Sequence, residues 1–207
     1  MENQEKIWDS LAESWNNFRN KPEEIVYYFK DKHTNNAGRI IDLGCGNARN
    51  LIPFNNFICY GADFSKKMLE KAKLKSDKYG LDLRLHKANL TKLPFKDNFF
   101  DYALVLASLH NLETKELRLN ALKEIYRILK KDGIALITVW NKWQLKFLLS
   151  KKDCLVPWKQ RDKTYYRYYY LFNYFELKNL LKKNNFKILE SKTGNGNLIF
   201  IVKKISR

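Results

Sequence analysis

Cysteine is scarce in this sequence, and its few copies form no recognisable site. The 207 residues include three cysteines, Cys45, Cys59 and Cys154, with no C-x-x-C spacing between them. A small odd set of this kind gives neither a disulfide framework nor the ligand spacing of a structural zinc site. We therefore expect reduced thiols and predict no metal site of the chain's own.

Long apolar runs are also missing. No stretch reaches the roughly 18 consecutive apolar residues that a membrane-spanning helix needs, so the sequence predicts no such span. The first six residues, MENQEK, are polar and lack the apolar run of a secretory signal. Together these absences lead us to expect a cytoplasmic protein.

Acidic residues are few relative to basic ones. Aspartate and glutamate number 22 against 39 lysines and arginines, which gives a formal net charge of +17. A positive field of this size favours polyanions and speeds their capture. A lysine-rich composition bias would give the same count, with pairs such as Lys66-Lys67 and Lys182-Lys183 on solvated helix faces. Charge therefore favours a nucleic-acid partner and leaves the second interpretation open.

The hydrophobic and aromatic residues that are present predict an α/β fold. They make up 45% and 14% of the chain, enough for a packed core, and the length suits one domain spanning 1–207. From Arg39 onward, apolar runs alternate with amphipathic helical stretches, which is typical of a parallel sheet. Helices are expected at 65–78, 114–129 and 174–183, with a short one from Asn47. Strands are expected at Arg39–Leu43, 57–63, 81–86, Phe100–Leu106, 134–140, 186–190 and 197–202.

Two segments depart from this alternation. Residues 1–36 form an N-terminal segment, helical over 7–29, outside the alternating core, and residues 143–172 form a basic, aromatic-rich insertion. Gly194-Asn195-Gly196 predicts a turn between two antiparallel strands. Lys131-Asp132-Gly133 is expected to end the helix before the fifth strand, with Gly133 supplying the turn.

The loop DLGCGNA at 42–48 follows the first strand and carries the clearest chemical signal. Gly44 and Gly46 allow the backbone to approach a ligand closely and to adopt positive φ at no steric cost. Asp63 ends the second strand, where a carboxylate can accept both hydroxyls of a ribose. The pattern predicts a nucleotide-like ligand.

The same loop argues against a nicotinamide dinucleotide. That fingerprint, G-x-G-x-x-G/A, needs a third small residue for tight helix packing, and Arg49 stands there. Asp42 at the strand end has no role in binding a pyrophosphate. A cationic sulfonium with a free amino group does favour a nearby carboxylate, so we predict S-adenosylmethionine.

Several motifs in order strengthen this prediction: the glycine loop, GADFS at 61–65, LPF at 93–95, FFD at 99–101 and RILKKDG at 127–133. With them the sequence resembles class I S-adenosylmethionine-dependent methyltransferases. The resemblance implies a Rossmann-like, seven-stranded, mostly parallel sheet with one antiparallel strand and helices on both faces. It places Asp42 and Gly44 near the methionine end, Asp63 at the ribose and Asn89 at adenine, where its amide oxygen would accept from N6. The predicted cofactor set is Asp42, Gly44, Gly46, Asp63, Phe64, Asn89, Leu90 and Ala107.

The loop after the fourth strand narrows the type of methyl acceptor. Residues 107–111 read ASLHN, without the prolines of an amine-binding loop, and no cysteine is available there for base-carbon methylation. An oxygen acceptor remains, either a hydroxyl that needs a base or a carboxylate that needs none. His110 is a candidate general base or hydrogen-bond donor, and a buried structural imidazole is the alternative.

Motifs outside the methyltransferase core are more specific: WDSLA at 8–12, FRNKP at 18–22, LHNLET at 109–114, VPW at 156–158 and YRYYYLF at 166–172. With these, almost the whole chain resembles the tRNA wobble-uridine carboxymethyl methyltransferases. The resemblance implies esterification of 5-carboxymethyluridine to 5-methoxycarbonylmethyluridine in tRNA. It also implies that a small zinc-binding activator protein pairs with a sheet edge.

Arg19 and Arg167 match the family's motif arginines, and a guanidinium can hold both oxygens of a carboxylate. We predict Arg19, His110 and Arg167 as catalytic residues. The predicted substrate-binding set is Arg19, His110, Asn111, Trp158, Tyr168, Tyr169 and Tyr170, with phosphates held by Lys151, Lys152, Lys159, Arg161 and Lys163. Asn111 and Tyr170 stand where the family usually has histidine, which puts the acceptor in question.

Two other functions stay open on the sequence. One is a small-molecule O-methyltransferase of the same class, against which the basic insertion argues. The other is a non-catalytic RNA-binding subunit with a decayed cofactor pocket, against which the intact glycine loop and Asp63 argue.

Overall fold

The computed structural model describes residues 3–160, 163–194 and 196–205. No helix in this part of the chain has the length and apolar character needed to cross a membrane. The helices are α1 (Gln4–Phe18), α2 (Glu24–His33), α3 (Lys66–Tyr79), α4 (Lys115–Ile128) and α5 (Tyr174–Lys183), with 3₁₀ turns η1 (Arg49–Phe54), η2 (Leu109–Asn111) and η3 (Leu145–Phe147). The strands are β1 (Arg39–Leu43), β2 (Ile58–Asp63), β3 (Leu83–Lys87), β4 (Phe100–Leu106), β5 (Leu129–Trp140), β6 (Asp153–Gln160), β7 (Lys163–Tyr170), β8 (Phe186–Gly194) and β9 (Asn197–Lys204).

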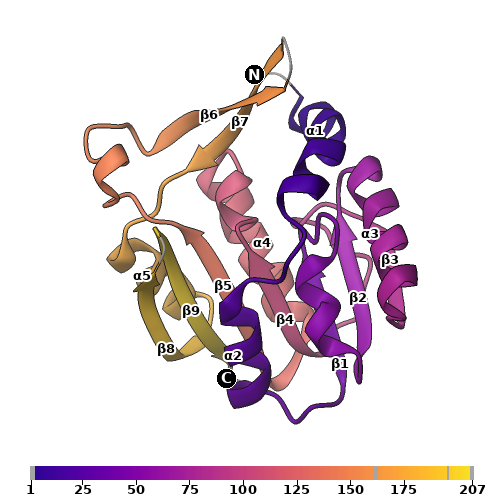
Figure 1. Ribbon diagram of the computed structural model, residues 1–207. Coiled ribbons are helices and arrows are strands. Elements are labelled where there is room, and N and C mark those ends of the chain that lie inside the picture. The colour runs from indigo at the N-terminus through magenta and orange to yellow at the C-terminus, as the bar shows by residue number, and fades with distance from the viewer. Residues whose placement is uncertain (1–2, 161–162, 195, 206–207) are drawn as a thin grey trace.

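Seven strands form one sheet in the order β3-β2-β1-β4-β5-β9-β8 (Figure 1). Strands β1 to β5 pair in parallel, whereas β9 is antiparallel to both β5 and β8. The central strand β4 is buried along most of its length, as its nearly continuous apolar sequence requires. The predicted seven-stranded, Rossmann-like class I methyltransferase sheet with one antiparallel strand is confirmed.

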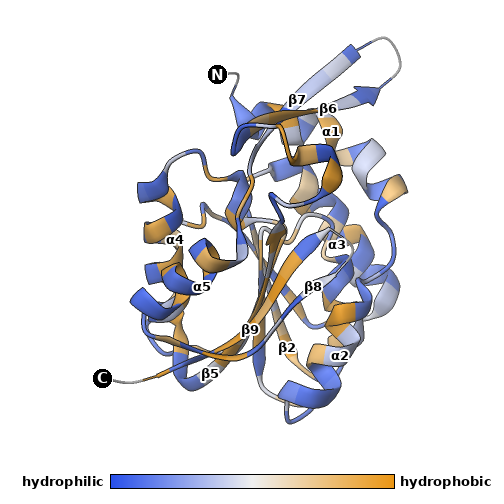
Figure 2. Ribbon diagram, turned by 90° about the vertical axis from the view of Figure 1, so that its left-hand side faces the viewer, coloured by the Kyte–Doolittle hydropathy of each residue, from blue (hydrophilic) through white to orange (hydrophobic). Residues whose placement is uncertain are grey.

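Helices cover both faces of the sheet. On one face α4 and α5 bury apolar stripes that include Leu122 and Leu177. On the other, α2, η1 and α3 bury Phe29, Phe54 and Ala72. Figure 2 shows the apolar strands enclosed between helices whose outer surfaces are hydrophilic. Side chains buried on both faces hold the sheet rigid, so its carboxyl edge is a fixed platform for a site.

The start of β5 differs from the prediction. Helix α4 ends at Ile128, before the segment 131–133. In that segment Asp132, not Gly133, adopts positive φ (63°). Gly133 is needed for another reason: a Cβ there would lie 2.9 Å from the carbonyl oxygen of Lys130. The glycine therefore allows a close backbone approach and does not supply the turn.

The burial of two neighbouring residues on α4 is the opposite of the prediction. Leu117, predicted on the buried face, is 36% exposed, and the neighbouring Arg118 is buried instead. The Arg118 guanidinium donates to the carbonyl of Leu112 and lies 3.6 Å from the ring centroid of Tyr170. A cation can be buried there because its hydrogen bonds and a ring face replace water.

Of the segments outside the alternating pattern, α1 and the basic insertion meet above the carboxyl edge of the sheet, whereas α2 packs on its face. The N-terminal segment divides into α1 and α2, with a break at 19–23 that contains Pro22. The basic insertion forms the β6–β7 hairpin, and α1 packs against both β7 and α3 (Figure 1). Of the predicted residues, Arg161 and Asn195 lie outside the described part of the chain.

Candidate active site

A cavity of about 1420 Å³ lies along the carboxyl edge of the sheet. Its floor is formed where β1, β2, β4 and β5 end, and its walls include residues of α1 and of the β6–β7 hairpin. In open α/β sheets, ligands bind outside the carboxyl ends of strands where the strand order reverses. Here β1 lies between β2 and β4, so the reversal falls beneath this cavity.

The glycine loop passes tightly between two strand ends. Gly44 has φ of 73°, and a Cβ on it would lie only 2.3 Å from Oγ of Ser108, in the loop after β4. Its N–H donates to the carbonyl of Ala62 at 2.7 Å, which holds the loop against β2. Gly46, with φ of 53°, also lines the cavity. Gly44 thus meets a steric demand that a residue with a Cβ would not, and Gly46 adopts the left-handed conformation at no steric cost.

Asp63 connects the loop to the end of β2. Its carboxylate accepts from the N–H of Gly46 at 2.8 Å and from that of Ser65 at 2.9 Å. Burial raises the pKa of Asp63 to about 6, although these backbone hydrogen bonds oppose the rise. Asp63 lines the cavity, and each oxygen keeps a lone pair for a ligand hydroxyl.

Asp42 lies beneath the loop and does not line the cavity. The side chain is buried, and its Oδ2 has no hydrogen-bond partner among the described residues. Burial raises the pKa of Asp42 to about 8, opposed in part by Arg49. A buried carboxyl of this kind favours a cation above the loop, and a sulfonium with an ammonium group supplies one. The residues present therefore fit S-adenosylmethionine.

The remaining predicted cofactor residues, Phe64, Asn89, Leu90 and Ala107, all line the cavity. Asn89, however, presents a different amide atom to the cavity from the one that we predicted. Its Oδ1 already accepts from the N–H and the hydroxyl of Thr91, at 3.1 and 3.0 Å. The amide nitrogen is thus the group left to face a ligand, so Asn89 offers a donor and not the acceptor expected for adenine N6.

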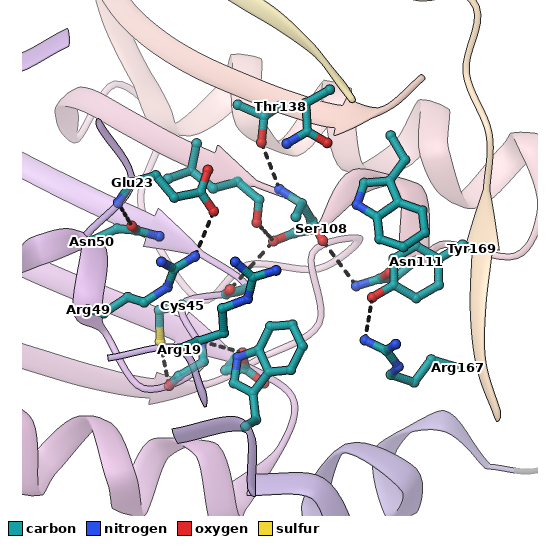
Figure 3. A pocket seen from close by; sticks show the side chains of 18 of the residues that line it. Arg19, Glu23, Cys45, Arg49, Asn50, Ser108, Asn111, Thr138, Arg167 and Tyr169 are labelled. Atoms are coloured by element: carbon teal, nitrogen blue, oxygen red, sulfur yellow. Dashed lines mark hydrogen bonds and ion pairs between the residues drawn. The ribbon is translucent and has the colours of Figure 1, made fainter. Parts of the chain in front are cut away.

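Two arginines reach the cavity from its walls. Arg167 on β7 is buried, and its guanidinium lies 5.0 to 5.7 Å from the ring centroids of Trp8, Trp15, Trp158 and Tyr169. It donates to the Tyr169 hydroxyl at 2.9 Å. Arg19, at the end of α1, points into the middle of the cavity (Figure 3). The pKa of Arg167 is lowered by burial and, further, by the positive charge of Arg19.

Neither Arg19 nor Arg167 forms an ion pair with any carboxylate of the described residues. Arg49, in the same cavity, is by contrast paired with Glu23 at 2.6 Å. Arg167 is a buried cation without a counterion, which is costly, and the exposed Arg19 adds a second positive charge at the cavity. An anion between them would remove that cost, so the geometry favours an anionic ligand at this point.

His110 is not where the sequence prediction placed it. Its side chain is fully buried and does not line the cavity. Its Nδ1 accepts from the N–H of Trp140 at 3.1 Å, and its ring lies against Tyr169, with centroids 4.7 Å apart. Burial, aided by Arg167, lowers the pKa of His110 to about 3. The imidazole is neutral and supports the wall, so its prediction as a general base in the cleft is corrected.

The predicted substrate residues divide into two groups. Asn111, Trp158 and Tyr169 line the cavity, whereas Tyr168 and Tyr170 do not. The Tyr168 hydroxyl bonds to Glu113 and Asp153, and that of Tyr170 to Glu176, within the hydrophobic core. Because strand side chains alternate between faces, Tyr169 points away from its two neighbours. The tyrosine standing in place of a family histidine at 170 therefore removes nothing from the cavity wall.

Several wall residues were not predicted from the sequence, among them Trp15, Met68, Ser108 and Trp140. Asp9, which does not line the cavity, was not predicted either. Its Oδ1 accepts from Ser65 Oγ at 2.6 Å and from the N–H of Lys67 at 3.1 Å. Asp9 thereby attaches α1 to the start of α3, beside the predicted ribose site. Only the helical phase of Trp8 and Trp15, seven residues apart, could have suggested a shared face.

The pKa of Asp42 predicts pH-dependent cofactor binding. Below about pH 8 the free protein carries a protonated Asp42, and the cationic ligand favours its ionised form. Binding should therefore release a proton, and affinity for S-adenosylmethionine should fall by up to about tenfold per pH unit as pH drops from 8 towards 6. Calorimetry in buffers of different ionisation enthalpy would count the proton. The neutral thioether S-adenosylhomocysteine should show a shallower dependence, and equal slopes for both ligands would contradict the assignment.

Asp42→Asn should change stability and cofactor affinity in opposite directions. An acid whose folded pKa lies above its unfolded value stabilises the fold at low pH and loses that contribution as pH rises through the folded pKa. Asn cannot ionise, so the ligand-free variant should melt at a higher temperature than the parent above pH 8. Its affinity for S-adenosylmethionine should nevertheless fall about tenfold or more. Lower stability at pH 8 together with unchanged affinity would refute this role.

Comparison with known proteins agrees with this geometry. Residues 41–137 match the family described as "Methyltransferase domain". A putative methyltransferase of Encephalitozoon cuniculi is 29% identical, over 96% of this chain and 94% of that protein. A tRNA (carboxymethyluridine(34)-5-O)-methyltransferase of Schizosaccharomyces pombe is 29% identical, over 89% of each. The chain spans only about a third of the probable tRNA methyltransferase 9B of Bos taurus and Homo sapiens.

Among solved structures, a SAM-dependent methyltransferase from Methanosarcina mazei has the same fold. Its TM-score is 0.74 at 20% identity, covering 90% of this chain and all of the other. Fold, glycine loop, buried acid and domain match lead to one conclusion. The chain carries a methyltransferase domain over residues 41–137, has the fold of class I S-adenosylmethionine-dependent methyltransferases and uses S-adenosylmethionine as its cofactor.

Proposed function

We propose that this protein methylates the carboxylate of 5-carboxymethyluridine at the wobble position of tRNA, giving the methyl ester. The observation that carries the proposal is the pair of unpaired guanidiniums, Arg19 and Arg167, in the cavity that the glycine loop also lines. A methyltransferase acting on an amine would gain nothing from two cations near its acceptor. A carboxylate acceptor is neutralised and oriented by them.

The chemistry asks little of the protein beyond positioning. S-adenosylmethionine, when bound, supplies an electrophilic methyl group. A carboxylate oxygen forms the new C–O bond as the S–CH₃ bond breaks, and the products are the ester and S-adenosylhomocysteine. Arg19 and Arg167 would hold the second oxygen and align the first, which is the orientation on which such a displacement depends. The acceptor enters as an anion, so no proton has to be removed.

The surroundings of His110 support a carboxylate acceptor over a hydroxyl. A hydroxyl needs a base, and no histidine is among the described residues that line the cavity. The lone pair of His110 is already used by the Trp140 N–H, and its pKa is lowered to about 3. An imidazole with so low a pKa is too weak a base to remove a proton from a hydroxyl near neutral pH.

The tRNA part of the proposal is supported by the net charge of +17 and by the relatives' names. In the insertion, Lys151, Lys159 and Lys163 form no ion pair with the described residues and stay available to phosphates, whereas Lys152 is paired with Glu176. A small zinc-binding activator remains part of the proposal. It would pair with an edge strand, β3 or β8, because unpaired edges are the surfaces open to strand addition.

Nucleoside mass spectrometry tests the proposal. tRNA bearing 5-carboxymethyluridine would be incubated with the protein and S-adenosylmethionine, with and without a candidate activator. We expect conversion of 5-carboxymethyluridine to a species heavier by one methyl group in place of a hydrogen. Methylation of a small hydroxylated acceptor alone would favour the small-molecule enzyme. Absence of cofactor binding by calorimetry would favour the non-catalytic RNA-binding subunit.

A further inference from the structure

The cavity is larger than a pocket for one small ligand and extends beyond the residues assigned to the cofactor and the acceptor. Pockets for a single small ligand occupy roughly 300–1,000 Å³, and this one encloses about 1420 Å³. Its lining extends from Asp63 at the end of β2 to Lys192 at the end of β8. The strand order β2-β1-β4-β5-β9-β8 gives five spacings of about 4.8 Å, or roughly 24 Å along the sheet edge.

The cofactor residues lie at or just after the ends of β3, β2, β1 and β4. Beyond them lies an outer lobe, above the ends of β5, β9 and β8, lined by Lys21, Tyr28, Thr138, Trp140, Lys146 and Lys192. Neither the predicted cofactor set nor the two acceptor arginines includes any of these residues. The outer lobe is continuous with the acceptor position, so a ligand there could be covalently attached to the acceptor.

The outer lobe combines free cations with aromatic rings. The amine of Lys192 lies 4.9 Å from the ring centroid of Tyr28, and that of Lys146 lies 4.8 Å from that of Trp140. Lys21, Lys146 and Lys192 are exposed, and none forms an ion pair with the described residues. Two carboxylates oppose these cations, Glu24 in the lining and Glu190, which accepts from the Tyr28 hydroxyl at 2.9 Å, while Glu23 is already neutralised by Arg49. The charge of the lobe is therefore positive on balance.

We propose that the outer lobe is a subsite for the nucleotide adjacent to the acceptor in a single-stranded RNA segment. Its base would stack on the exposed Tyr28, and its phosphate would lie between Lys21 and Lys192. Such a pairing of stacking rings with lysines is how proteins hold unpaired nucleic acid without reading its sequence. The inference rests on the proposed function only in taking the acceptor to be part of an RNA.

A binding experiment tests the subsite without relying on methyl transfer. Fluorescence anisotropy would follow a short labelled oligouridine binding to the full chain saturated with S-adenosylhomocysteine. Lys21→Gln/Lys192→Gln should weaken binding about tenfold. It should also make the plot of log affinity against log salt shallower by about 0.7, the contribution of the one phosphate that the two lysines share. The matched control, Lys123→Gln/Lys183→Gln, removes the same charge from exposed positions on α4 and α5 outside the cavity.

The outcomes separate this inference from the proposed function. Loss of oligouridine binding in the outer-lobe variant alone supports the subsite, even if no carboxymethyluridine is ever methylated. Equal losses in both double variants would mean that only the overall field binds RNA, and would overturn the subsite. So would a competition in which uridine monophosphate displaces the probe as effectively as unlabelled oligouridine does.

Discussion

Arg19→Gln and Arg167→Gln should each lower kcat/KM for a carboxymethyluridine acceptor by roughly two to three orders of magnitude. Removing one partner of a desolvated charge pair costs about 2–5 kcal/mol, and each tenfold loss in rate corresponds to about 1.4 kcal/mol. Neither guanidinium has another anion to bind among the described residues, so the loss should fall on the acceptor. Affinity for S-adenosylmethionine should stay within about twofold of the parent, as calorimetry would show.

Controls distinguish this role from a structural one. Arg167→Lys keeps the charge but not the planar fork, and should give an intermediate loss. Lys123→Gln removes a cation from an exposed position on α4, outside the cavity, and should leave kcat/KM unchanged. Arg167 is packed among aromatic rings, so the melting temperature of each variant must be measured as well. Full activity of a folded Arg19→Gln protein would contradict the assignment of that residue.

Gly44→Ala should abolish cofactor binding and lower stability strongly. The added Cβ would lie 2.3 Å from Ser108 Oγ and 2.7 Å from Ser108 Cβ, so the loops after β1 and β4 would have to separate. The residue would also keep a φ of 73°, at a cost of about 1–2 kcal/mol for a non-glycine residue. Calorimetry should find affinity reduced by more than a hundredfold, and thermal unfolding should show a lower midpoint.

Gly80→Ala is the matched control for this change. Gly80 ends α3 with φ of 61°, and no atom lies within 4 Å of the place that a Cβ would take, so only the dihedral cost applies. Its variant should lose some stability and no cofactor affinity. Adding Ser108→Gly to Gly44→Ala should recover part of the lost stability, because it removes the clash. If Gly44→Ala were no more harmful than Gly80→Ala, the close approach of the two loops would be refuted.

The fold could be predicted from the sequence because its signals are local. Apolar runs such as Phe100–Leu106, the Ser65 cap of α3 and the glycine turn before β9 each lie within a few residues, and each sets one element. Details set by distant contacts could not be predicted in this way. The burial of Arg118 depends on Tyr170, and the requirement for glycine at 133 depends on a neighbouring carbonyl.

The residues of the site also fall into those that the local sequence predicts and those whose positions depend on distant contacts. The glycine loop and Asp63 are contiguous with strand ends, so their spacing was enough to locate them in the cavity. The position of His110 could not be inferred, because η2 turns its ring beneath Tyr169 and away from the cleft. Likewise, the strand alternation that selects Tyr169 over Tyr168 and Tyr170 depends on the register of the β6–β7 hairpin. The outer lobe is joined only by folding, since Lys21 lies more than a hundred residues before Lys146 and Lys192 in the chain.

Selection of a carboxylate acceptor by two arginines beside the cofactor loop is the central claim. The most direct measurement compares methyl transfer to two anticodon stem-loops that differ in one group, 5-carboxymethyluridine and the uncharged 5-carbamoylmethyluridine. We expect transfer to the acid at a rate that far exceeds transfer to the amide, and loss of that preference in Arg19→Gln. Equal transfer to both stem-loops, or transfer to the amide alone, would contradict the claim.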